Sequence, residues 1–428
     1  MNAILPLGSG EPAANAAGFL ARYEAARDGL AGDVSARDEA ANWLRRHGFP
    51  SRRDEAWRYT SLRPVWDTAF DRHSVDVDAA QRMFRTVMTC AGLDVDGDAA
   101  LKRLVFVNGV LSAALTTASG AMFAGPEIGE PVRHPMVALN TMLAEDGATI
   151  HVPAGVDGGR LLIVTLGLGT AGPAASHLRH RIVLDEGASL SLFEIASGEG
   201  TYLHETVSDF SVAVGAHARH VRLQQDAPDA FSFSTIRVAV AERGAYDGFN
   251  LALGASLARH EVHATLNGPH GAVHVNGAQL LGGSQVADLT SVISHEAPDC
   301  ISRQTVKNVL TERSRGVFQG KIFVARVAQK TDGYQMNQAL LLSENAEIDC
   351  KPELEIYADD VKCSHGATAG ALDEEQLFYM RSRGVPETEA RAILVRAFLD
   401  DALALVEDEL VRGVLDRAVE HWWVGRIT

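Results

Sequence analysis

The pattern of hydrophobic and polar positions divides the chain into three stretches. The first ninety or so residues have helical texture, with alanine-rich and charged segments at 19–27 and 38–45. An aromatic segment follows at 55–62, and we expect it to pack against the rest of the protein. From about Leu104 the pattern becomes alternating and β-branched, which predicts short strands with one buried face.

The pattern becomes helical again after Gly370. Acidic residues after Asp373 favour a helix N-terminus, and this helix is expected to end near Gly384. Pro386 is expected to start a second helix, whose apolar stripe faces a core or a partner and contains Ala390, Ile393, Leu394, Ala397 and Phe398. We therefore predict a helical domain over 1–100, a β core over 101–371 and a helical domain over 372–428.

Turn signals recur through the β region at a nearly fixed period. Glycine followed by alanine appears at steps of 28, 29 and 27 residues, beginning at Gly187, and after a longer gap the series continues at Gly316 and Asn345. A period near 28 carried by strands and turns predicts a mainly β fold, a right-handed parallel β-helix (β-solenoid) flanked by helical domains. Chance recurrence of Gly-Ala pairs is the alternative, whereas the leucine-rich-repeat consensus is absent from the sequence.

Charge and cysteine content limit the partners and the compartment. The 39 Lys and Arg against 55 Asp and Glu give a net charge of −16, which disfavours nucleic acid and anionic membranes and favours proteins, metal ions or cofactors. Four cysteines, with no basic and apolar leader, predict a cytosolic protein with reduced thiols. The uncharged runs 104–126 and 161–178 are interrupted by polar residues or glycine, and we expect strands there rather than membrane spans.

The sequence shows no complete catalytic motif. The glycine-rich segment 316–322 lacks the spacing and the final Ser or Thr of a phosphate-binding loop, so we expect no nucleotide hydrolysis by this chain alone. Histidines three residues apart, such as His260 and His263, fall on opposite faces of a strand, which argues against a shared metal there. His270 and His274 are expected to be solvated or structural.

The segment 359–366 carries the strongest candidate chemistry. Cys363 and His365 are two residues apart, so in a strand both side chains point to the same face. Thiolate and imidazole suit zinc, copper or an iron–sulfur cluster. Two ligands do not complete such a site, which predicts a half-site at an interface. Spacing alone favours the alternative, a buried Cys363 and a hydrogen-bonded core or turn His365, because no further ligand motif accompanies the pair.

Longer motifs resemble the SufB/SufD family of the Suf iron–sulfur cluster assembly machinery, and within it the SufD branch. In the SufB branch we would expect a Glu-His-Glu-Ala-Thr-like segment where this chain has 363–368. The resemblance covers about the C-terminal third specifically, and its motifs lie at 57–60, 106–109, 288–289, 302–304, 307–308, 318–322, 328–332, 351–368 and 377–384.

The resemblance implies a β-helix core and a cytosolic, non-enzymatic scaffold. It implies pairing with SufB as a heterodimer, docking of the ATPase SufC, homodimers in isolation, and sulfur delivered by a desulfurase. His365 would then help to hold iron or a transient cluster at the SufB interface, with Cys363 as a weaker ligand; a flavin in the complex is left open. The SufC surface is expected within about 372–409, at Leu377, Phe378, Tyr379, Arg381 and Arg383.

Two alternatives belong to other functional classes. A β-helical carbohydrate-active enzyme would need a carboxylate-lined external groove and usually a secretion signal. A purely structural dimer would leave His365 incidental, and co-purification with SufB and SufC separates it from the scaffold.

Overall fold

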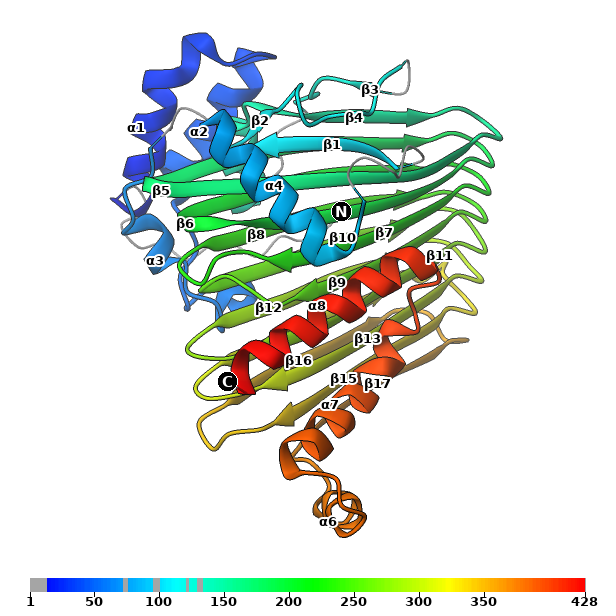
Figure 1. The fold of residues 1–428 in the computed structure, drawn as a ribbon. Coiled ribbons are helices and arrows are strands. Elements are labelled where there is room, and N and C mark those ends of the chain that lie inside the picture. Colours follow the sequence, from blue (N-terminus) through cyan, green and yellow to red (C-terminus); the bar gives the residue numbers. More distant parts are fainter. Residues whose placement is uncertain (1–13, 72–75, 95–100, 121–122, 129–133, 428) are drawn as a thin grey trace.

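The strands stack into a parallel β-solenoid with helices on its outer faces (Figure 1). The computed structural model describes residues 14–71, 76–94, 101–120, 123–128 and 134–427. The mainly β fold predicted from the sequence is therefore confirmed. Each coil contributes one strand to each of two facing sheets, and each strand hydrogen-bonds to the equivalent strand of the next coil.

One sheet contains β1 and most of the odd-numbered strands, and the other contains β4 and the even-numbered strands. The long strands β5 and β6 turn the corner and belong to both sheets. The first sheet comprises β1 (Lys102–Val107), β5 (Asp157–Leu184), β6 (Ser189–Val212), β7 (His217–Gln225), β9 (Ala245–Ala252), β11 (Ala272–Leu281), β13 (Ile301–Leu310), β15 (Asp332–Leu341) and β17 (Lys362–Gly370). The second adds β4 (Asp146–Val152), β8 (Phe231–Val240), β10 (Leu257–Leu266), β12 (Val286–His295), β14 (Arg315–Val324) and β16 (Glu347–Ile356). The short β2 (Val110–Leu111) and β3 (Phe123–Ala124) pair antiparallel with β1 and β4.

The register explains the predicted repeat and one error in it. Val286 pairs with Arg315 and Ala272 with Ile301, so neighbouring coils are 29 residues apart in both sheets. The glycines of the first four Gly-Ala signals lie one or two residues before β6, β7, β9 and β11, as a turn requires. Gly316, however, lies inside β14, so its prediction as a turn is wrong. The first four signals mark turns before strands of the first sheet, whereas Gly316 belongs to β14 of the second sheet.

Helices pack on the outer face of both sheets, and their apolar side chains form hydrophobic clusters with the outward-facing residues of the strands. Apolar side chains of α4, α7 and α8 pack with outward residues of the first sheet, such as Leu223 and Leu280. Those of α1, α2, α3 and α5 pack on the second sheet. The helices are α1 (Ala17–Ala26), α2 (Val34–His47), α3 (Arg63–Trp66), α4 (Val77–Ala91), α5 (Pro135–Leu143), α6 (Glu374–Ser382), α7 (Glu387–Leu403) and α8 (Glu409–Ile427), with 3₁₀ turns at Ala14–Ala16, Arg27–Gly29 and Glu55–Trp57.

The buried face of α7 differs from the predicted stripe. Ala390 is buried as expected, and Leu394 and Phe398 are partly buried. Ile393 and Ala397 are exposed, and the face is centred on Val395 and Leu399. The curved outer sheet therefore contacts a face rotated from the one that apolar spacing indicates. No described helix is long and apolar enough to cross a membrane.

The predicted aromatic segment fastens the N-terminal region to the second sheet. Trp57 is buried, and the Arg259 guanidinium lies over its ring at 4.0 Å from the centroid. The Thr60 hydroxyl donates to Asp288, which also pairs with Arg259. Lys351 of β16 reaches Glu55 at 2.7 Å. Breaking a buried ion pair is costly, so the Arg259 guanidinium is expected to keep its contacts with Trp57 and Asp288. These contacts hold the segment 55–62 against the second sheet.

Buried histidines make the stability of the solenoid sensitive to acid. His295 is fully buried, its Nε2 lies 2.9 Å from the Ser302 hydroxyl, and burial lowers its pKa to about 4. In the unfolded chain the imidazole takes up a proton below about pH 6.5. Stability that is present above that pH is therefore lost as the pH falls toward 4, by up to about 3 kcal/mol from this residue.

We expect His295→Gln to flatten this pH dependence. Urea unfolding of the wild type and the variant at pH 7, 5.5 and 4 gives the free energy of unfolding at each pH. The wild-type value should fall more steeply, by about 1.4 kcal/mol per pH unit for one proton. His421→Gln, at an exposed position on α8, serves as the control. Equal slopes in wild type and His295→Gln would contradict the expectation.

Candidate functional site

The last coil of the solenoid leaves its inward-facing side chains accessible. Within the described residues, β16 and β17 each pair along one edge only, with β14 and β15. Inward residues one coil below, such as Phe318 and Ile322, are fully buried, whereas Cys350 and Leu354 above them are half-buried. The final coil therefore presents both unpaired backbone and an uncovered core.

Cys363 and His365 both belong to this last coil and share a face, as the spacing predicted. By register His365 lies over Gln335 and Cys363 over Gly333, and both of those residues are buried. His365 is exposed, while Cys363 is half-buried against a small apolar cluster that includes Ile322 and Ala358. The imidazole is thus the accessible member of the pair.

Burial changes the chemistry expected of the thiol. It raises the pKa of Cys363, and the negative charge of Asp332 adds to this. At neutral pH the group is therefore a neutral thiol, and it must lose its proton before it can bind a metal.

Gln335 is a residue that sequence reasoning missed. Its side chain is fully buried beneath His365, and neither amide atom has a hydrogen-bond partner among the described residues. A Cβ added at Gly320 would lie 3.0 Å from its Oε1, so the amide reaches across the interior. Gln304 continues this polar row one coil further in and accepts a hydrogen bond from Ser291. A buried amide group without a hydrogen-bond partner destabilises a fold by about 1–3 kcal/mol. These glutamines are therefore unfavourable for the stability of the isolated chain.

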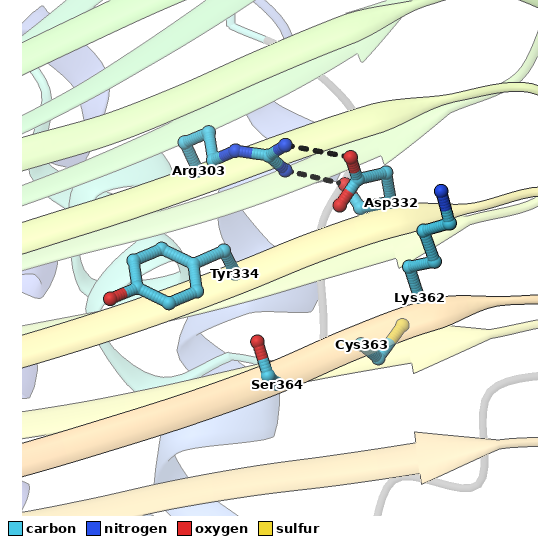
Figure 2. A pocket seen from close by; sticks show the side chains of 6 residues that line it. All are labelled: Arg303, Asp332, Tyr334, Lys362, Cys363 and Ser364. Atoms are coloured by element: carbon cyan, nitrogen blue, oxygen red, sulfur yellow. Dashed lines mark hydrogen bonds and ion pairs between the residues drawn. The ribbon is translucent and has the colours of Figure 1, made fainter.

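An open depression of about 330 Å³ lies beside Cys363 on the rim of the last coils (Figure 2). Arg303 and Asp332 form an ion pair at 2.7 Å on one side of it, and Tyr334, Lys362 and Ser364 complete the lining. Charges of both signs and a half-buried thiol suit a protein contact better than a small apolar ligand.

The predicted partner surface on α6 is largely exposed. This helix begins after Asp373, whose carboxylate accepts from the Glu375 N–H at 2.8 Å, and it projects beyond the last coil (Figure 1). Phe378 and Tyr379 are 73% and 59% exposed. Arg383 lies over the Tyr379 ring at 5.2 Å from the centroid.

The remaining two residues of that prediction differ from each other. Leu377 is 3% exposed, so it is not part of the accessible surface of α6. The helix turns this side chain toward the protein and Phe378 away from it. Arg381 is at the surface and pairs with Glu387 of α7 at 3.5 Å.

The fold is that of a parallel β-solenoid with helical flanks, and its open final coil presents an accessible imidazole. Comparison with known proteins gives the family. Residues 168–398 match the family model described as SUF system FeS cluster assembly, SufBD core domain. The chain therefore belongs to the SufBD family of iron–sulfur cluster assembly proteins.

Individual relatives agree with this assignment. The chain is 33% identical to the iron–sulfur cluster assembly protein SufD of Escherichia coli, over 87% of this chain and 89% of that protein. It is 29% identical to the SufBD family protein slr0076 of Synechocystis, over 90% of both. It is also 31% identical to the chloroplastic protein ABCI7 of Arabidopsis thaliana, over 66% of this chain and 61% of that protein. The chain is thus a SufD homologue.

Proposed function

We propose that this chain is a non-catalytic scaffold subunit on which an iron–sulfur cluster is assembled at an interface with a SufB-type partner. The observation that carries the proposal is the open last coil, which presents His365 from an uncovered core. Family membership gives the cargo, and the unpaired edges of β16 and β17 give a surface onto which strands of a second solenoid could add.

His365 is proposed as the iron or cluster ligand of this chain, with Cys363 as a secondary ligand. A neutral imidazole binds iron without losing a proton, whereas the thiol must first be deprotonated. One or two ligands leave coordination positions unfilled, so the partner would supply the rest. A site completed only across an interface holds its cluster loosely enough for transfer, as a scaffold requires.

A SufC-type ATPase is proposed to dock on the exposed side chains of α6. Phe378 and Tyr379 provide apolar area, and Arg381 and Arg383 provide charge at the rim, which is the composition of a protein-binding hot spot. The helix stands close to β17, so a movement of α6 during an ATP cycle would be felt at the interface. In isolation the same open coils would pair with a second copy of this chain. A cytosolic location is part of this proposal.

We expect His365→Ala to abolish cluster assembly without disturbing the fold. In the complex reconstituted with SufB-type and SufC-type partners under anaerobic conditions, cluster yield measured by absorption should fall at least about tenfold. Co-purification and circular dichroism should be unchanged, because the side chain is exposed. His151→Ala, an exposed histidine on β4, is the control. An unchanged cluster yield would remove His365 from the site and favour the purely structural dimer.

We expect the double substitution Phe378→Ala and Tyr379→Ala to weaken ATPase docking. Truncating one hot-spot residue costs about 2 kcal/mol or more, which is about 30-fold in Kd, so loss of both aromatic anchors should raise the Kd for the SufC-type partner by at least about 30-fold even if their contributions do not add. Titration calorimetry measures the Kd, and pairing with the SufB-type partner should persist. Val77→Ala, exposed at the start of α4, is the matched control. An unaltered Kd would place the docking surface elsewhere.

A further inference from the structure

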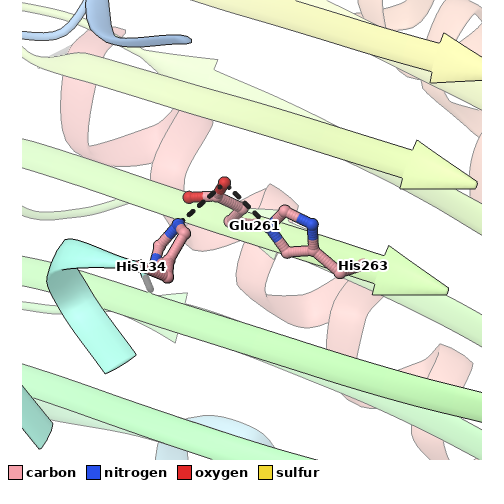
Figure 3. A group of neighbouring side chains, drawn as sticks. All are labelled: His134, Glu261 and His263. Atoms are coloured by element: carbon pink, nitrogen blue, oxygen red, sulfur yellow. Dashed lines mark hydrogen bonds and ion pairs between the residues drawn. The ribbon is translucent and has the colours of Figure 1, made fainter. Parts of the chain in front are cut away.

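Three potential metal ligands converge on the outer face of the second sheet, far along the chain from the open coil. His134 precedes α5, and Glu261 and His263 lie on β10 (Figure 3). The Nε2 atoms of His134 and His263 lie 3.2 and 2.9 Å from the same carboxylate oxygen, Glu261 Oε1. Among the described residues this is the group whose ligand atoms all fall within 4.8 Å of one another.

The sequence could not reveal this cluster. His260 and His263 lie on opposite faces of β10, as predicted, with His260 inside the solenoid and His263 outside. Glu261 and His263 share the outer face because they are two residues apart in a strand. The third member, His134, is 127 residues away from Glu261 and reaches it because α5 packs on this sheet.

The carboxylate is ionised and already oriented. Burial alone would raise the pKa of Glu261, but Arg259 and the two histidines hold it well below the usual range. Arg259 Nε binds the other carboxylate oxygen at 3.1 Å, which leaves Oε1 directed at the two imidazoles. Asp288 also pairs with Arg259, so the cluster of these charged groups keeps a net negative charge.

We propose that His134, Glu261 and His263 bind one divalent transition metal, zinc or ferrous iron. Two imidazoles and one carboxylate form a donor set that suits these ions and leaves at least one coordination position for water. The side chains of His134 and His263 are 16% and 35% exposed, so an ion can enter from solvent. The ion would join the start of α5 to β10.

Metal binding at this site requires a rearrangement of protons. Without metal, an imidazole N–H can donate to Glu261 Oε1, and the Val137 N–H donates to His134 Nδ1 over a long 3.4 Å. A metal takes the Nε2 lone pairs, so the ring protons must sit on Nδ1 and the contact with Val137 is given up. Binding needs neutral imidazoles, because a proton and a metal ion compete for the same ring nitrogen.

A second histidine–carboxylate–histidine bridge in the same chain provides an internal comparison. His217 Nε2 and His274 Nδ1 lie 2.5 and 2.6 Å from Asp247, but they bind different carboxylate oxygens. The ligand atoms of this bridge do not converge on one point. It has the same kinds of residue, two histidines and a carboxylate that are partly exposed, without the geometry that a single ion needs.

The test is calorimetric titration of zinc chloride into the full chain stripped of metal, in a His365→Ala background so that the open coil contributes no imidazole. We expect one equivalent of zinc to bind at pH 7.5. His263→Ala, which removes a partly exposed ring and should fold, and His134→Ala should each lower the affinity at least about tenfold, because even substitutions outside the ligand shell cost 10–100-fold. His274→Ala should leave it unchanged.

Thermal unfolding gives an independent readout. Zinc should raise the Tm of the His365→Ala parent and of the His274→Ala variant but not of the His263→Ala variant, because a ligand that binds only the folded state stabilises it. Absence of zinc binding, a zinc affinity in the His134→Ala and His263→Ala variants equal to that of the parent, or loss of binding in the His274→Ala variant alone would each overturn the proposal. None of these results bears on the cluster site at His365.

Discussion

Backbone pairing between successive coils is the interaction on which this structure depends, and it has to end somewhere. Every inner strand satisfies its N–H and C=O groups through the coils on both sides, so the stack extends at no cost except at its ends. At the beginning, β1 and β4 are covered by short antiparallel strands. At the other end, β16 and β17 have no such cover among the described residues. The end of the solenoid is therefore both its weakest part and the part best suited to meet another protein.

The position of the candidate site follows from that ending. Inside the solenoid an imidazole stacked over Gln335 would be sealed from solvent, as His295 is. On the last coil the same inward direction leaves His365 open. His365 is exposed because, among the described residues, no strand pairs with the outer edge of β17. Below it lies the polar row of Gln304 and Gln335, whose amide nitrogens have no hydrogen-bond partner among the described residues.

Sequence reasoning was successful where the physics is local. Alternation and turn residues predicted the solenoid, and the spacing of Cys363 and His365 placed both on one face. It failed where three-dimensional packing decides. The turns before the strands of the first sheet and those before the strands of the second sheet recur with the same period, so spacing alone does not distinguish the two series. Gly316 therefore fits the repeat although it lies within β14. Leu377 is buried and Phe378 exposed because α6 is oriented by its neighbours, and no periodicity in a nine-residue helix reports that. The meeting of His134 with β10 depends on how α5 docks, which no local pattern contains.

The contacts of the N-terminal segment 55–62 with Arg259, Asp288 and Lys351 have a consequence for biosynthesis. Thr60 and Glu55 leave the ribosome long before Asp288 and Lys351, from which they are separated by 228 and 296 residues. The surface that receives the N-terminal segment does not exist until most coils have been translated. The first-made part of this protein must therefore wait, and nascent chains are expected to keep Trp57 uncovered through most of elongation, where chaperones can reach it.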